Sequence, residues 1–167
     1  MFQIILSRLI WFFVLVVLQV IVLNHVHIFG YATPLPYIYL LLILPGETPR
    51  WAYVAIGFFL GLIIDMFTNT PGVAAGATCL TGLMVPLLLK VSTPNETSDE
   101  NFFPSYKSME WTSFIRYAVL ATLVQTTAFF SLESFSFLEW QSLLINVIGS
   151  TILTTLFIAA LELIRNK

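Results

Sequence analysis

The chain has few charged residues and almost no cysteine. Only 10% of its 167 residues are charged, whereas a soluble domain carries roughly 25% because its surface must be solvated. The single cysteine, Cys79, excludes an internal disulfide framework and cysteine spacings that bind metals. Seven lysines and arginines form no basic cluster, so the sequence does not predict a nucleic-acid partner. These shortages argue against an ordinary soluble domain.

Long apolar runs take the place of the missing charges. Hydrophobic residues make up 58% of the chain, and several runs approach the roughly 20 residues that cross a bilayer as a helix. A membrane barrel would need segments of about ten residues with alternating polarity, and these runs are continuous instead. The sequence predicts an all-α integral membrane protein. It is one transmembrane domain over residues 1–167, a six-helix bundle with spans at about 9–28, 34–45, 51–66, 72–89, 111–131 and 140–164.

The second of these spans is short. Its apolar part covers about 11 residues, which rise roughly 16 Å as a helix, about half of the hydrocarbon core. Pro34, Pro36 and Pro45 punctuate it, and proline inside a helix breaks the hydrogen-bond ladder. We expect this span to tilt, to borrow length from its neighbours, or to cross only in part.

The basic residues fall in alternate connections. Residues 24–33, 66–70 and 132–139 contain none, and the basic residues elsewhere are Arg8, Arg50, Lys90, Lys107, Arg116, Arg165 and Lys167. Positive residues concentrate in cytoplasmic segments of membrane proteins. The pattern therefore predicts a cytoplasmic loop at 90–110 and both termini in the cytoplasm.

Asp65 is the acidic residue most clearly tied to the membrane. Gly57, Gly61 and Asp65 are four positions apart and share one helix face, where small residues let another helix approach closely. One interpretation is that the carboxylate binds the free amides at the start of the next helix. The other is a proton or ligand site. We favour the structural interpretation because no second intramembrane acid or base accompanies Asp65.

The connection after Asp65 is short and ends in Pro71 and Gly72. Such a short link predicts an antiparallel hairpin between the spans at 51–66 and 72–89. Gly72 and Gly76 repeat the small-residue spacing on the second arm. We expect both glycines to contribute to the tight packing of this hairpin.

The last span carries a polar stripe. Asn146, Ser150 and Thr154 are four positions apart, and such a stripe in lipid faces another helix, either in the same chain or in a partner. Packing within the chain is the favoured alternative. Gln125 on the preceding span is the expected hydrogen-bond partner.

Motifs that would indicate an enzyme are missing from the sequence. It has no phosphate-binding glycine loop, no zinc-binding helix motif and no serine elbow. His25 and His27 lie two apart without a third ligand nearby, which does not predict a metal site. Glu162 and Arg165 have the spacing of an ordinary surface pair. We therefore expect no catalytic residues, no metal and no cofactor.

One segment resembles a known family. Its sequence is Gly57-Phe-Phe-Leu-Gly61-Leu-Ile-Ile-Asp65-Met-Phe-Thr-Asn-Thr-Pro71-Gly72. It is similar to the third span of the rod shape-determining protein MreD, which ends in Leu-x-x-Asp before a short link. The chain length, the six spans and the polar central loop also resemble MreD. The prolines around the second span look like those of Bacteroidetes-type versions.

The resemblance implies a non-enzymatic subunit of the bacterial inner membrane. Such a subunit binds the single-span protein MreC and helps couple MreB filaments to the cell-wall synthases of lateral peptidoglycan elongation. It also implies a fold like the S-component, the substrate-binding subunit of energy-coupling-factor importers. That kinship supplies an alternative function, a vitamin-like small-molecule site near the outer face, with contributions from Asp65, His25 and Asn24. We favour the scaffold because the inward faces are mostly aliphatic and aromatic.

Overall fold

The structure, a computed structural model, describes residues 14, 15, 17, 19, 33–93, 102–105, 107–134 and 140–165. All regular elements within these ranges are helical. Four helices are long and apolar enough to cross a membrane. The prediction of an all-α chain is confirmed for the described residues, and these four helices are consistent with membrane spans. They are α3 (Arg50–Thr68), α4 (Val73–Ser92), α5 (Trp111–Ser134) and α6 (Trp140–Arg165).

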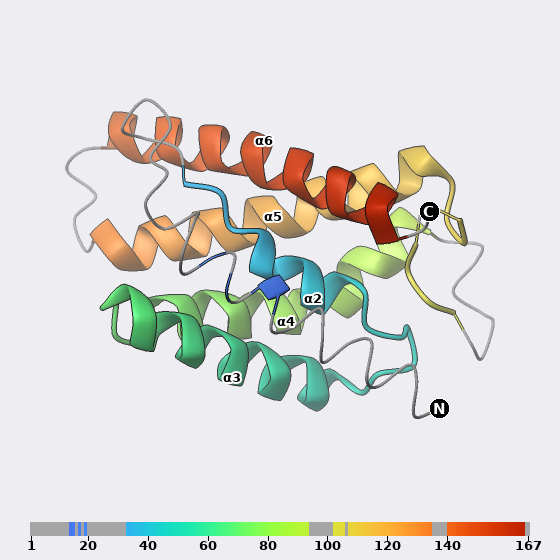
Figure 1. Ribbon diagram of the computed structural model, residues 1–167, viewed down its shortest axis with the longest axis horizontal. Helices are drawn as coiled ribbons and strands as arrows, with labels where there is room; N and C mark the ends of the chain where they lie inside the picture. The colour runs from blue at the N-terminus through green and yellow to red at the C-terminus, as the bar shows by residue number, and fades with distance from the viewer. Residues whose placement is uncertain are drawn as a thin grey trace.

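These four helices run antiparallel to one another in chain order (Figure 1). Helix α3 packs on α4, α4 on α5, and α5 on α6. The shortest, α3, has 19 residues and a length of about 28 Å, close to the thickness of the hydrocarbon core. The predicted spans at 51–66, 72–89, 111–131 and 140–164 correspond to these four helices.

The prediction of six spanning helices is wrong for the second span. Residues 33–35 belong to no regular element and lead into a 3₁₀ turn, η3 (Pro36–Ile38), and a four-residue helix, α2 (Tyr39–Leu42). Proline stands at the start of η3, where it cannot donate to a helix ladder. The segment therefore breaks up instead of crossing as one helix. The predicted first span at 9–28 lies outside the described residues except for positions 14, 15, 17 and 19.

The broken second segment lies in the middle of the bundle (Figure 1). Tyr37, Ile38, Tyr39, Leu41 and Leu42 are all fully buried. Its turn η3 contacts α6, and α2 contacts α3 and α4. Irregular backbone is tolerated at membrane depth only where protein surrounds it, which is the position of this segment.

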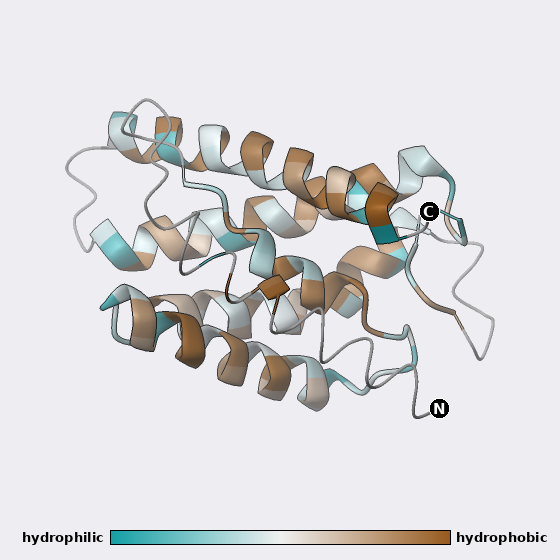
Figure 2. Cartoon of the chain, in the orientation of Figure 1, coloured by the Kyte–Doolittle hydropathy of each residue, from teal (hydrophilic) through white to brown (hydrophobic). Residues whose placement is uncertain are grey.

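The outer surface of the bundle is apolar. Trp51, Phe59 and Met66 on α3 are 74%, 63% and 77% exposed, and Ile148 and Leu156 on α6 are also exposed. Figure 2 shows hydrophobic residues recurring along all four long helices. Water would disfavour such a surface, and lipid would not.

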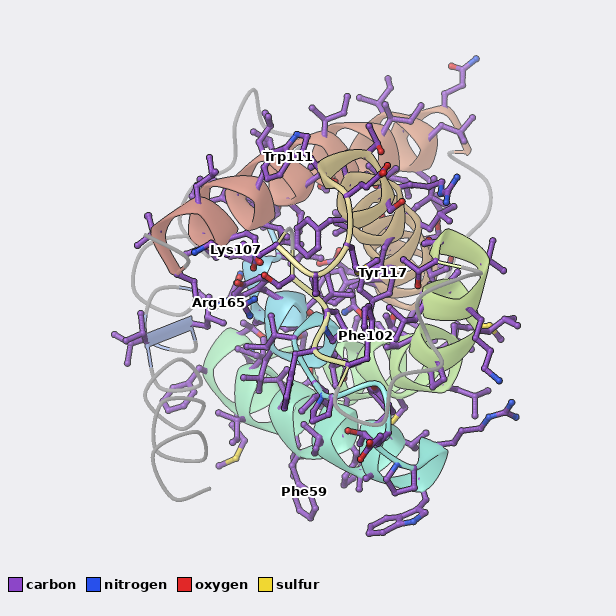
Figure 3. The ribbon with its side chains drawn as sticks, turned by 90° about the vertical axis from the view of Figure 1, so that its right-hand side faces the viewer. Phe59, Phe102, Lys107, Trp111, Tyr117 and Arg165 are labelled. Carbon is purple, nitrogen blue, oxygen red and sulfur yellow. The ribbon has the colours of Figure 1, made fainter. Side chains whose placement is uncertain are left out.

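The described basic residues lie at one end of the bundle. They belong to the start of α3, the end of α4, the segment before α5, the start of α5 and the end of α6, which are adjacent in an antiparallel arrangement: Arg50, Lys90, Lys107, Arg116 and Arg165. This end lies on the right in Figure 1 and faces the viewer in Figure 3, where Lys107 and Arg165 are labelled. The fold thus gathers the positive charges that the sequence distributes over several connections.

Candidate functional site

Helices α3 and α4 approach so closely that only glycine fits at two positions of α3. A Cβ at Gly57 would lie 2.6 Å from the carbonyl oxygen of Thr78, and a Cβ at Gly61 would lie 2.4 Å from the Cα of Ala75. The Thr78 hydroxyl lies 2.7 Å from the carbonyl oxygen of Gly57 and joins the two helices further. The face that Gly57 and Gly61 share is therefore the contact face of the hairpin.

The glycines of α4 do not take the role that their spacing predicts. Gly76 is exposed, and a Cβ there would meet only Leu132 of α5, at 3.1 Å. Gly72 precedes α4 with φ of 85° and has open space around it, so it serves the turn and not the packing. The glycine of α4 that packs on α3 is Gly82, where a Cβ would lie 2.6 Å from the carbonyl oxygen of Tyr53.

Gly82 was missed because it lies outside the Gly72 and Gly76 spacing. It is six residues after Gly76, which places it on a different face of α4. The residues of α4 that line the contact with α3 over two turns are all small, Ala74, Ala75, Thr78 and Gly82. A search for small residues including alanine and threonine would have found this face.

Asp65 binds the start of α4. Its two carboxylate oxygens accept hydrogen bonds from the backbone N–H groups of Gly72 (3.1 Å), Ala74 (2.8 Å) and Ala75 (2.9 Å). The Thr70 hydroxyl donates a fourth bond, at 3.0 Å. These are groups that the first turn of a helix leaves without partners. The geometry agrees with the capping interpretation of this residue.

The link between the two helices is shaped to allow this cap. Asn69 and Gly72 both adopt positive φ, 58° and 85°, and so reverse the chain within a few residues. Pro71 lies between them and is exposed. Asp65 is only 4% exposed, and the positive end of the α4 dipole balances its charge. Four donors already occupy its oxygens, which favours a structural role over a proton or ligand site.

The polar stripe on α6 binds backbone and not another helix. The Ser150 hydroxyl accepts a hydrogen bond from the N–H of Thr33 and the Thr154 hydroxyl accepts one from the N–H of Leu35, both at 3.0 Å. Residues 33–35 belong to no helix or strand, so these N–H groups have no partner within a regular element. The stripe therefore supports the broken second segment. Asn146, one turn earlier, has a buried Oδ1 without a hydrogen-bond partner.

Gln125 does not bind this stripe, in contrast to the prediction. It is fully buried, accepts a hydrogen bond from Thr81 of α4 at 2.7 Å and donates one to the Tyr37 hydroxyl at 3.0 Å. Threonine pairs join α5 to α6 instead, Thr122 with Thr155 at 3.1 Å and Thr126 with Thr151 at 2.8 Å. Gln125 thus links α4, α5 and the buried segment.

Glu162 and Arg165 are not the surface pair that their spacing predicts. Glu162 is fully buried and lies 2.9 Å from the Arg165 guanidinium, and it also accepts a hydrogen bond from the Tyr39 hydroxyl of α2. The Arg165 guanidinium lies 5.6 Å from the centre of the Tyr39 ring and donates to the carbonyl oxygen of Pro104, at 3.4 Å. The end of α6 is thereby fixed to α2 and to residues 102–105. Helix periodicity alone could not reveal this burial, because α2 supplies it.

The core of the described residues is thus largely apolar, and most of the polar side chains buried in it are paired with backbone or with one another. Among them, no group of three histidine, cysteine, aspartate or glutamate side chains is placed to hold a metal ion. His25 and His27 lie outside the described residues. Comparisons of this chain with protein families, with curated proteins and with solved structures find no match.

Proposed function

We propose that this chain is a non-enzymatic scaffold subunit of the bacterial inner membrane. In this role it binds MreC and helps couple MreB filaments to lateral peptidoglycan synthesis. The proposal rests on the α3–α4 hairpin. The segment from Gly57 to Gly72 that resembles MreD is also the segment whose glycines and Asp65 fix the hairpin.

The interior chemistry supports a scaffold. Buried polar side chains bind backbone or one another: Asp65 binds the start of α4, Gln125 binds Thr81 and Tyr37, and Thr154 binds the segment before η3. Paired polar groups in the interior rigidify a fold, and only a few buried polar atoms of the described residues, such as the Oδ1 of Asn146, are left without a partner. Such a bundle is suited to hold a partner in a fixed orientation.

One observation favours the alternative of a small-molecule importer subunit. The buried Oδ1 of Asn146 has no hydrogen-bond partner, and Asn146 lies near the start of α6, at the end of the bundle opposite the basic residues. That end is the outer one if the basic residues are cytoplasmic. A pocket for a vitamin-like molecule near the outer face would need more such groups converging on one cavity.

Co-purification distinguishes the two functions. We expect MreC to remain bound to the tagged chain in mild detergent, and not to an unrelated multi-span protein with the same tag. The Gly61→Leu variant should lose MreC to the extent that it loses its fold, as judged by size-exclusion chromatography. If MreC washes off the intact chain while an importer ATPase pair and its membrane partner are retained, the scaffold proposal is wrong.

A further inference from the structure

An open apolar groove runs along the outside of the α3–α4 hairpin. Its volume is about 470 Å³, and the side chains along it include Trp51, Val54, Ala55 and Phe58 of α3 with Cys79 and Leu83 of α4. The small residues Ala55 and Cys79 contribute to a groove that is otherwise bordered by aromatic and branched side chains. Phe59 also lines it and projects outward from α3 in Figure 3.

A single cation stands at one end of this groove. Arg50 is the first residue of α3 and lines the groove. Its exposed side chain makes no hydrogen bond or ion pair with the described part of the chain. Glu47 in the preceding turn forms no ion pair with it either. The guanidinium is therefore available to an external anion, and it can bind two phosphate oxygens at once.

The depth of the groove matches one leaflet of a membrane. Arg50 lies at the basic end of the bundle, and Trp51 beside it is a residue type enriched at the membrane boundary. Phe58 follows eight residues later on α3, about 12 Å deeper along the helix axis. The groove thus begins at headgroup level, continues into the acyl-chain region, and combines a cation with an apolar channel.

We propose that this groove binds an anionic phospholipid, with Arg50 on the headgroup phosphate and an acyl chain along Val54, Ala55, Phe58 and Cys79. The charge of Arg50 selects the lipid. An uncharged apolar face would accept any acyl chain, whereas an unpaired guanidinium at its mouth favours a net negative headgroup. The site is independent of the proposed scaffold function.

Native mass spectrometry of the purified full chain tests the selection. We expect phosphatidylglycerol to be retained more strongly than phosphatidylcholine with the same chains. Arg50→Gln should lower that preference roughly two- to fivefold, the range of an exposed ion pair. Lys90→Gln is the matched control, because Lys90 is an exposed cation at the same end of the bundle but does not line the groove. If both variants lowered the preference for phosphatidylglycerol equally, general surface charge would explain it and the proposal would be overturned.

Alkylation of Cys79 tests the location. Cys79 is the chain's only cysteine and lines the groove, so bound lipid should slow its reaction with a maleimide in detergent. Phosphatidylglycerol should protect the wild-type chain more than Arg50→Gln, and Ala55→Phe, which fills the groove, should abolish lipid-dependent protection. Helical circular dichroism confirms that each variant is folded. If lipid is retained but does not protect Cys79, the lipid binds elsewhere. If Cys79 is protected in a lipid-free dimer, the groove binds a second copy of the chain. Either result contradicts the proposal.

Discussion

Asp65 is the only carboxylate of α3 and α4. A charge at the centre of a span costs roughly 2.5 to 3.5 kcal/mol on insertion scales, and less near a helix end such as the last turn of α3, where Asp65 lies. Here the cost is offset by three backbone N–H groups and one hydroxyl that donate to it, and by the positive end of the α4 dipole. The same hydrogen bonds stabilise α4, because its first turn would otherwise leave buried amides without acceptors.

Removing the Asp65 cap should destabilise the hairpin. We expect Asp65→Ala to lower the free energy of unfolding by about 2 kcal/mol, the upper range for a lost helix cap, and Asp65→Asn to have a smaller effect because one oxygen acceptor remains. Denaturant titration in detergent, followed by circular dichroism, measures the difference. Glu110→Gln is the control, since Glu110 is exposed. Equal stability of Asp65→Ala and Glu110→Gln would rule out the capping role.

The two glycines Gly61 and Gly76 give a matched test of packing. A Cβ at Gly61 would lie 2.4 Å from the Cα of Ala75, whereas a Cβ at Gly76 would meet only the end of the Leu132 side chain. We expect Gly61→Ala to cost about 1 to 3 kcal/mol as overpacking does, and Gly76→Ala to be neutral or slightly stabilising because alanine favours helix. Thermal unfolding of the two purified variants compares them directly. The packing account fails if Gly76→Ala proves the more damaging change.

Sequence spacing predicted some of the residues in the contact between α3 and α4 but not all of them. The four-residue repeat of Gly57, Gly61 and Asp65 placed the three on one face correctly, because one helix determines that relation. It could not show which face of α4 they meet, since that depends on the crossing of two helices. Gly82 was therefore missed and Gly76 was assigned wrongly.

At the scale of elements, the broken segment at 33–44 depends on its neighbours. Its backbone groups cannot all pair within so short a helix, and lipid offers no partners. The surrounding helices supply them: Ser150 and Thr154 accept from residues 33 and 35, and the hydroxyl of Tyr117 donates to the carbonyl oxygen of Leu42 at 3.4 Å. The hydroxyls on α6 thus accept hydrogen bonds from backbone N–H groups that have no helical partner in this segment.

This dependence predicts unequal effects for two identical substitutions. Thr154→Val removes the acceptor for the N–H of Leu35 and leaves that group buried and unpaired, at a cost of about 1 to 3 kcal/mol. Thr127→Val changes an exposed residue on α5 and should be nearly neutral. Unfolding of both variants in detergent gives the comparison. If Thr127→Val cost as much as Thr154→Val, the loss would reflect the threonine-to-valine change itself and not the bond to Leu35.

The four long helices could be predicted from the sequence. For the broken segment there were two signals in the sequence, the short length of its apolar run and its prolines. Long apolar runs identify spanning helices because each run must match the bilayer by itself. The burial of Glu162 could not be predicted in this way. It depends on Tyr39 and Arg165 meeting it from α2 and from the next turn of α6, and three-residue spacing is equally typical of an exposed pair.

At the scale of the whole molecule, the surface differs from that of a soluble protein more than the core does. Large apolar side chains such as Trp51, Phe59 and Met66 are exposed, and the largely apolar core also holds fully buried polar residues such as Gln125, Thr81 and Glu162. The described basic residues gather at one end of the bundle, which faces the viewer in Figure 3. Together these features are consistent with an apolar solvent around the helices and water at the two ends. The fold itself does not distinguish the two orientations, so the predicted orientation rests on the charge asymmetry.

The orientation can be tested on a single helix. Helix α5 has 24 residues, about 36 Å in length, enough to place its two ends on opposite sides of the membrane. Glu110, just before α5, and Ser134, its last residue, are both exposed. In a Cys79→Ser background we expect an impermeant maleimide on intact spheroplasts to label Ser134→Cys and to spare Glu110→Cys, because the positive-inside rule predicts that the basic end faces the cytoplasm. Permeabilisation should make Glu110→Cys reactive, which shows that protection came from the membrane and not from burial. Labelling of Glu110→Cys alone on intact cells would reverse the orientation and place Arg50 and its groove in the outer leaflet.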